Sequence, residues 1–202
     1  MNQLILASTS IYRAQLIEKL GIPFKAIKPS FDEEAAKLEA LQKRLKPVEV
    51  AETLSRGKTL SLSLSLNPQT ALVGGDQLVH FEGEIIGKSK NFETAFAQLK
   101  KMRGKTHELI TSVTLHSQTE TRHVNHITVL KMKNLSDVEI ENYLLRDQPY
   151  DCAGSYKIEN LGITLFSDIQ CSDFSAIQGI PLIWLSNQLK EMGYEFFKRA
   201  NE

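Results

Sequence analysis

Polar residues that can bind anions or cations gather at three places in the sequence, each beside an apolar run. Arginine, lysine and hydroxyl groups are the usual partners of phosphate oxygens. Carboxylates among them would repel a polyphosphate unless a divalent cation such as Mg²⁺ or Mn²⁺ lay between. The residue types therefore indicate a polyphosphate site that uses a metal ion. The three groups are Ser8, Ser10 and Arg13; Asp32 and Glu33; and Asp76 with the more distant Lys88.

Each group also has a purely structural interpretation. Ser8 and Ser10 could do no more than cap a following helix, and Asp32 and Asp76 could serve turns. Neither a GxxxxGK[ST] nor a GxGxxG nucleotide fingerprint occurs in the sequence. From the residues alone both interpretations stay open.

The histidines and cysteines give weaker signals. His123 and His126 are three residues apart in a predicted strand, which places them on opposite faces and argues against a shared metal. We expect His107 to be a polar surface residue. Cys152 and Cys171 match neither a zinc nor a disulfide pattern, so we expect small core residues.

The composition excludes several broad classes of protein. The 202 residues carry 24 Lys and Arg against 24 Asp and Glu, and 42% of them are hydrophobic. A zero net charge argues against a protein that coats nucleic acid or a membrane surface. The start MNQLILAST has no charged region, and no run approaches the roughly 20 apolar residues of a membrane span. We expect a soluble cytoplasmic protein, either an enzyme or a binding module.

Apolar periodicity and capping residues predict alternating elements in the first part of the chain. Residues 60–66 read LSLSLSL, whose alternation favours a strand, but we assign the stretch to the end of a helix. Ser10, Gly21 and Pro47 mark expected helix ends. The expected elements are a strand at 4–7, a helix at 11–20, a strand at 24–28, a solvated helix or ordered loop at 35–46, and a helix at 47–62.

The rest of the chain also mixes predicted strands and helices. Because strands and helices mix without a linker, we predict one domain over residues 1–202 with an α/β or α+β fold and a mixed sheet. The expected elements are a strand at 71–73 that passes through 74–77 into a hairpin, helices at 92–102, 136–146 and 181–192, and strands at 106–116, 121–133 and 163–169.

Eight motifs in order along nearly the whole chain resemble the Maf-like nucleotide pyrophosphatases. The resemblance implies a twisted mixed sheet flanked by helices, as in the house-cleaning inosine triphosphatases, with two lobes around a central cleft. It also implies a homodimer, and hydrolysis of a nucleoside triphosphate between its α and β phosphates with Mg²⁺, Mn²⁺ or Co²⁺. The motifs are LILASTSIYR (4–13), FDE (31–33), GGDQ (74–77), GKS (87–89), GKTHELIT (104–111), SDVEIENY (136–143), CAGSYKIENLGITLF (152–166) and SAIQGIPL (175–182).

The resemblance assigns roles residue by residue. Asp76 is implied as the base that orients or deprotonates the attacking water, and Glu33 joins Asp76 as a metal contact. Lys58 has a competing interpretation, because it could be an ordinary solvated lysine of a helix. The implied phosphate-binding residues are Ser8, Arg13, Lys58 and Lys88.

Three positions that sort substrates within the family read Tyr12, Gln77 and Glu159 here. They are similar to the 7-methyl-GTP branch, whereas the dTTP/UTP branch has arginine, threonine and glutamine. Glu159 could accept both adjacent donors of guanine. Tyr12 could add a cation–π attraction of about 0.5–2 kcal/mol to a methylated, cationic base, although less than a tryptophan would.

Some positions depart from the family pattern. Ile11 stands where proline is common, Ala14 replaces the second arginine of a pair, and Ser89 replaces proline after Lys88. These changes bear on the tightness and selectivity of the site and remove none of its proposed catalytic residues. Two alternatives to a 7-methyl-GTP enzyme remain: a dTTP/UTP pyrophosphatase, and a nucleotide-binding regulator of cell division with little turnover.

Overall fold

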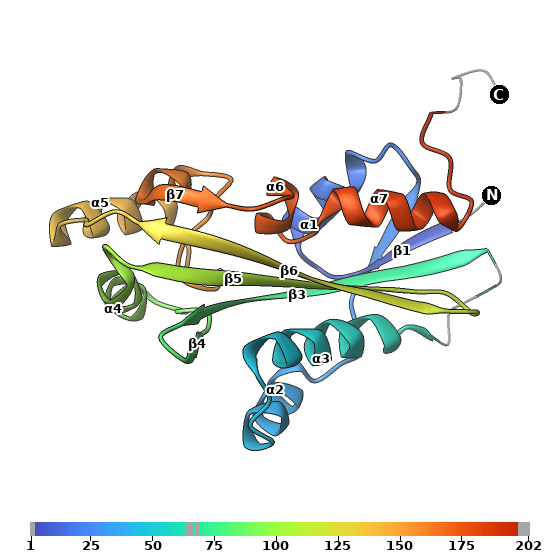
Figure 1. Cartoon of the computed structure of the whole chain (residues 1–202), viewed down its shortest axis with the longest axis horizontal. Coiled ribbons are helices and arrows are strands. Elements are labelled where there is room, and N and C mark those ends of the chain that lie inside the picture. The colour runs from blue at the N-terminus through green and yellow to red at the C-terminus, as the bar shows by residue number, and fades with distance from the viewer. Residues whose placement is uncertain (1–2, 64–66, 68, 198–202) are drawn as a thin grey trace. The chain divides into compact units, whose positions relative to one another are not determined.

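The fold is known from a computed structural model that describes residues 3–63, 67 and 69–197. Its strands are β1 (Gln3–Ala7), β2 (Phe24–Ile27), β3 (Thr70–Phe81), β4 (Glu84–Ile86), β5 (Thr106–His116), β6 (Thr121–Met132) and β7 (Phe166–Gln170). They form a sheet in the order β2-β1-β3-β5-β6-β7, with β4 paired to β3 (Figure 1). Strand β1 is parallel to β2 and β3, whereas the β3–β4 and β6–β7 pairs are antiparallel. The expected mixed sheet flanked by helices is confirmed.

Most helices begin where the sequence predicts them. Ser10, Asn91 and Ser136 each accept a hydrogen bond from a backbone N–H of the first turn that follows, and Pro47 is the first residue of its helix. The helices are α1 (Ile11–Glu18), α2 (Glu33–Gln42), α3 (Pro47–Leu60), α4 (Phe92–Met102), α5 (Asp137–Asp147), α6 (Phe174–Ile177) and α7 (Leu182–Glu191). None within the described part of the chain is long and apolar enough to cross a membrane.

The chain divides into two compact units, and the boundary falls within strands β3, β5 and β6. Unit 1 comprises Met1–Asp76, Thr111–His126 and Asp173–Glu202. Unit 2 comprises Gln77–Ile110 and Ile127–Ser172.

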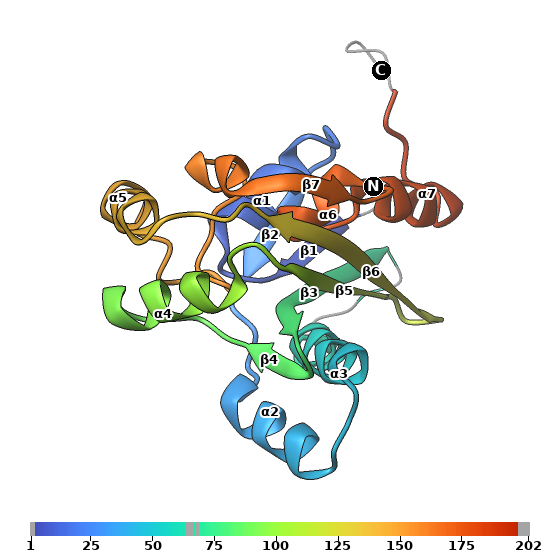
Figure 2. The same ribbon diagram turned by 60° about the vertical axis from the view of Figure 1, so that its left-hand side comes forward.

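The core of unit 1 follows from the alternation of side chains along β1. Leu4 and Leu6 join the apolar cluster formed with residues of α1 and α7, whereas Ile5 and Ala7 join a second cluster on the other face. Figures 1 and 2 show α1 and α7 over one face of the strands and α3 over the other, with α2 beside α3. This arrangement leaves the C-terminal end of β1 and the start of α1 beside each other in sequence and in space.

His107 lies in a buried aromatic group of unit 2, contrary to the prediction that it is a surface residue. His107 is only 2% exposed, so its assignment to the surface is wrong. Its ring lies against Tyr156 and Phe166, and its Nε2 is 3.1 Å from the Tyr156 hydroxyl. Burial lowers the pKa of His107 to about 4, so the ring is neutral near pH 7.

Several boundaries also differ from the prediction. The expected strand at 163–169 begins instead with a 3₁₀ helix, Leu161–Leu165, because the N–H of Gly162 turns back to the carbonyl of Lys157 at 3.0 Å. The helix predicted at 47–62 ends at Leu60, and residues 64–66 of the LSLSLSL stretch lie outside the described residues. The short helix α6 was not predicted.

The prediction that both cysteines are core residues is wrong. Cys152 and Cys171 are half-buried thiols. Burial raises the pKa of Cys152 to about 12, so this thiol stays protonated near neutral pH.

Candidate functional site

Lys58 of α3 lies between two carboxylates of unit 1. Its Nζ is 2.6 Å from Oδ1 of Asp76 and 2.8 Å from Oε2 of Glu33. Only 13% of the Lys58 side chain and 8% of the Asp76 side chain are exposed. The interpretation of Lys58 as a solvated helix lysine is therefore wrong.

Asp76 is a strand residue and does not serve a turn. It lies inside β3, which continues through the two preceding glycines to Phe81. Its burial among strands is unusual for a carboxylate, which is seldom fully buried without a partner. Lys58 supplies that partner.

Two glycines allow Lys58 to reach both carboxylates. A Cβ on Gly57 would lie 2.2 Å from the ring of Phe31, so the helix accepts this ring only because residue 57 has no side chain. Phe31 in turn brings Glu33, two residues later, to Lys58. A Cβ on Gly74 would lie 2.4 Å from Oγ1 of Thr59. Helix α3 can therefore lie close to β3 just before Asp76.

Buried hydroxyls hold α3 against strand β5. Ser55 and Thr114 share a hydrogen bond of 2.7 Å, and the Thr59 hydroxyl donates to the backbone carbonyl of Thr114 at 3.5 Å as well as to that of Ser55 within the helix. All three residues are fully buried. Gly57 and Thr59 are not among the residues predicted from the sequence, although a glycine inside a helix is itself a signal of close packing.

Arg13 contributes a second cation to unit 1. Its Nε donates to the backbone carbonyl of Gly179 at 3.3 Å. Desolvation lowers the pKa of Arg13, and the nearby charges of Asp76 and Glu33 oppose that shift. Arginine remains charged in proteins, so it adds a fixed positive group near the two carboxylates. Tyr12, the preceding residue of α1, is half-buried.

The hydroxyls at the start of α1 have local partners. The Oγ of Ser8 accepts from the N–H of Ser10 at 3.1 Å, and the Oγ of Ser10 accepts from the N–H of Arg13 at 3.4 Å. Ser10 therefore caps α1, as its structural interpretation expects, whereas Asp32 caps α2 and does not serve a turn. Ser8 is buried at the end of β1, and a hydroxyl that accepts one bond can still donate its own hydrogen.

The remaining predicted residues belong to unit 2. Lys88 is exposed just after β4, and its backbone forms an antiparallel bridge with Ala153. Glu159 is exposed, but partial desolvation raises its pKa, with the charges of Asp147 and Asp151 acting in the same direction. Gln77 is half-buried and follows Asp76 in β3, so the two side chains leave opposite faces of the strand.

Glu33 and Asp76 are the predicted metal contacts. Among the described residues, no group of three or more histidine, cysteine, aspartate or glutamate side chains could hold a metal ion by itself. Mg²⁺ usually binds one or two carboxylates together with substrate phosphates and water. The two carboxylates fit such a site only when a phosphate completes it.

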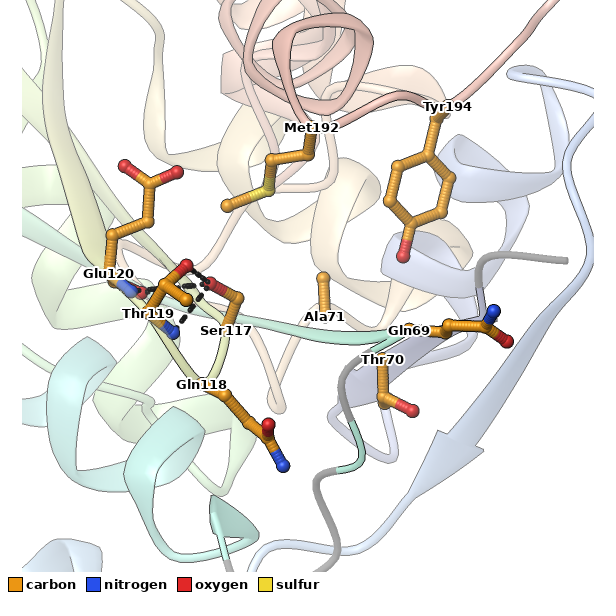
Figure 3. A pocket seen from close by; sticks show the side chains of 9 residues that line it. All are labelled: Gln69, Thr70, Ala71, Ser117, Gln118, Thr119, Glu120, Met192 and Tyr194. Carbon is orange, nitrogen blue, oxygen red and sulfur yellow. Dashed lines mark hydrogen bonds between the residues drawn. The ribbon is translucent and has the colours of Figure 1, made fainter.

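Neither Glu33 nor Asp76 lines the cavity of about 200 Å³ in unit 1 (Figure 3). It opens at the start of β3, near Ala71, with Ser117 and Glu120 on the β5–β6 turn and Met192 and Tyr194 after α7. Among the described residues that line the cavity, Glu120 is the one acidic residue and is paired with Arg122. None of these lining residues carries a positive charge that could bind a phosphate.

The fold is a mixed α/β sheet flanked by helices, and unit 1 carries the charged cluster of Lys58, Asp76 and Glu33. The comparison with protein families makes this specific: the family described as Maf-like protein matches residues 3–192, and the chain belongs to that family.

Curated relatives are similar over almost their full length. The 7-methyl-GTP pyrophosphatase of Bdellovibrio bacteriovorus is 45% identical over 189 residues, covering 94% of this chain and 96% of the relative. The protein of the same name from Bordetella pertussis is 36% identical, covering 96% and 94%. The structure of the Staphylococcus aureus Ham1 protein matches with a TM-score of 0.53 and 13% identity, covering 94% of this chain and 100% of that one. This last likeness shows the fold alone.

Proposed function

We propose that this protein hydrolyses the α–β phosphate bond of a nucleoside triphosphate, and that its substrate is 7-methyl-GTP. The relatives that carry the name 7-methyl-GTP pyrophosphatase span nearly the whole chain. The observation that carries the proposal is the charged cluster of Lys58, Asp76 and Glu33 beside Arg13, in which Lys58 and Asp76 are nearly buried and Glu33 is half-exposed. The cluster supports the proposal because Asp76, the candidate base, has Lys58 and Arg13 nearby, and such cations suit phosphate oxygens.

In the proposed reaction a water molecule attacks the α phosphorus. Its oxygen forms the new P–O bond, the bond from the α phosphorus to the bridging oxygen breaks, and pyrophosphate leaves. Asp76 accepts a hydrogen bond from the water and takes its proton. The products are the nucleoside monophosphate and pyrophosphate.

The cations of the chain would stabilise the phosphates. Arg13 supplies a planar group with several donors, and Lys58 and Lys88 supply compact charges for the leaving pyrophosphate. Ser8 would donate its hydroxyl hydrogen to a phosphate oxygen.

We also propose that a divalent cation, Mg²⁺, Mn²⁺ or Co²⁺, is required. Glu33 and Asp76 would hold it, because two carboxylates and phosphate oxygens form a usual Mg²⁺ site. When bound, such an ion neutralises phosphate charge and polarises the phosphoryl group.

Base recognition would fall to Glu159, Gln77 and Tyr12. The carboxylate of Glu159 can accept from the N1–H and the exocyclic amine of guanine, which a pyrimidine does not present together. The ring of Tyr12 suits the positive charge that methylation at N7 adds to the base.

The deciding experiment measures pyrophosphate release from a panel of nucleotides with each of the three cations and with EDTA. We expect the highest kcat/KM for 7-methyl-GTP and loss of activity in EDTA. Preference for dTTP and UTP would refute the proposed substrate. Nucleotide binding without turnover would favour a regulator of cell division. Light scattering of the same sample tests the homodimer that we expect.

A further inference from the structure

The side-chain amide of Gln98 joins two segments of unit 2 that each carry a proposed site residue. Its Nε2 donates to the backbone carbonyl of Gly87 at 3.2 Å, next to Lys88. Its Oε1 accepts from the hydroxyl of Ser155 at 2.6 Å, four residues before Glu159. Because the Gly87 carbonyl can only accept, the orientation of the amide is fixed, and Ser155 must be the donor on the other side.

Backbone contacts join the same two segments beside Gln98. Lys88 forms an antiparallel bridge with Ala153, and the N–H of Lys90 donates to the carbonyl of Tyr150 at 3.0 Å. The segment that follows β4 and the 150–155 segment therefore form one piece, and Gln98 of α4 links its two sides.

The 150–155 segment ends in a conformation that needs such support. Gly154 and Ser155 have φ values of +73° and +60°. A serine rarely adopts this left-handed conformation, which persists only where surrounding contacts fix it. Ser155 is fully buried, and Gln98 accepts the hydrogen of its hydroxyl.

The residues after Ser155 are anchored as well. The hydroxyl of Tyr156 lies 3.1 Å from Nε2 of His107, and the N–H of Lys157 donates to the hydroxyl of Tyr143 at 3.1 Å. The path of the chain from Ser155 toward Glu159 is therefore set by contacts with Gln98, His107 and Tyr143.

We propose that Gln98 is a positioning residue that fixes Lys88 and Glu159 relative to each other, so that phosphate binding and base selectivity depend on it. This inference rests on the proposed function, because it takes the roles of Lys88 and Glu159 from it. Gln98 contacts neither phosphate nor base in this proposal and acts through the two segments it joins.

The test compares Gln98→Met, which keeps the length of the side chain, with Ser155→Ala and the double variant. We expect Gln98→Met to raise KM for 7-methyl-GTP about tenfold, as the loss of one or two partly buried hydrogen bonds would, while kcat changes less. The preference for 7-methyl-GTP over UTP should fall with it. The double variant should be no worse than Gln98→Met alone, because both changes break one connection.

Glu93→Ala serves as the control, since Glu93 is an exposed residue of the same helix. If the wild type is active and Gln98→Met matches this control in KM and in selectivity, the inference is wrong. If Gln98→Met fails to fold, Ser155→Ala decides by the same criteria.

A wild type that hydrolyses no nucleotide would refute the proposed function instead. Hydrogen exchange at the amide of Lys90 then decides the inference alone. Faster exchange in Gln98→Met than in Glu93→Ala supports the linking role of Gln98, and equal exchange overturns it.

Discussion

The ammonium of Lys58 lies 2.6 Å from the carboxylate of Asp76, in a buried position where it also meets Glu33. One cation therefore serves two carboxylates that come from distant parts of the sequence. A buried ion pair that loses one partner leaves an uncompensated charge, which is costly. The charges of Lys58, Asp76 and Glu33 are therefore coupled, and a change to one of them affects the other two.

Replacing Asp76 by asparagine should abolish turnover. The change removes the proposed base, whose contribution is typically about 10²–10⁴-fold in rate. Asparagine keeps the shape and one acceptor for Lys58, and Glu33 remains as its charged partner. Pyrophosphate release and calorimetric nucleotide binding should therefore separate, with binding largely kept. Full activity of the variant would remove Asp76 from its role.

The close approach of Phe31 to Gly57 makes a prediction about packing. Gly57→Ala should destabilise the protein by about 1–3 kcal/mol through overpacking, even though alanine is the better helix former. The added Cβ would meet the Phe31 ring at 2.2 Å. Denaturant unfolding measures the loss, and the double variant Gly57→Ala/Phe31→Leu should recover part of it. An equally large loss in both variants would place the cause elsewhere.

Because the pKa of Glu159 is raised, we expect the selectivity for the nucleobase to decline at low pH. Glu159 must be ionised to accept two donors from guanine, and its pKa lies above the ordinary 4.5. The preference for 7-methyl-GTP over UTP should therefore fall, as the pH is lowered, at a higher pH than an ordinary glutamate would give. The pH profile of kcat/KM for both nucleotides measures this. Glu159→Gln should show a weakened preference without this decline at low pH, and an unchanged substrate profile would contradict the role in base recognition.

His107 predicts a specific loss of stability in acid. Its pKa is about 4 in the folded protein and 6.5 for an ordinary histidine, so the unfolded chain binds the proton more readily. The buried neutral ring therefore contributes fully to the free energy of unfolding above pH 6.5. This contribution is lost as the pH falls toward 4, by about 3 kcal/mol in total. Unfolding at several pH values should show this slope in the wild type and a shallower one in His107→Phe. Parallel slopes would mean that the ring is not buried in solution.

Local patterns in the sequence predicted much of the fold. Capping residues such as Ser10 and Ser136 and the short apolar run of residues 4–7 are signals that act over a few positions, and the elements they mark are present. The 3₁₀ helix before β7 was missed because it depends on how Gly162 turns back onto Lys157.

The residues of the candidate site come from the family resemblance, whereas the contacts between them could not be predicted from the sequence. The resemblance singled out Lys58, Glu33 and Asp76, but no spacing in the sequence shows that one ammonium touches both carboxylates. That geometry depends on Gly57 and Gly74, whose importance lies in the side chains they lack. His107 was misplaced for a similar reason, since its burial depends on Tyr156, which is distant in sequence.

Asp76 and Gln77 are adjacent residues of β3, so their side chains lie on opposite faces of the strand. A shift of the strand by a single residue would exchange them, so that the proposed base would point where the selectivity residue belongs. The pairing of Gln3 with Thr70 and of Leu6 with Val73 fixes this register several residues earlier. A substitution at Gln77 that is meant to alter nucleotide preference therefore changes the same stretch of backbone that orients Asp76. Specificity and turnover would have to be re-engineered together.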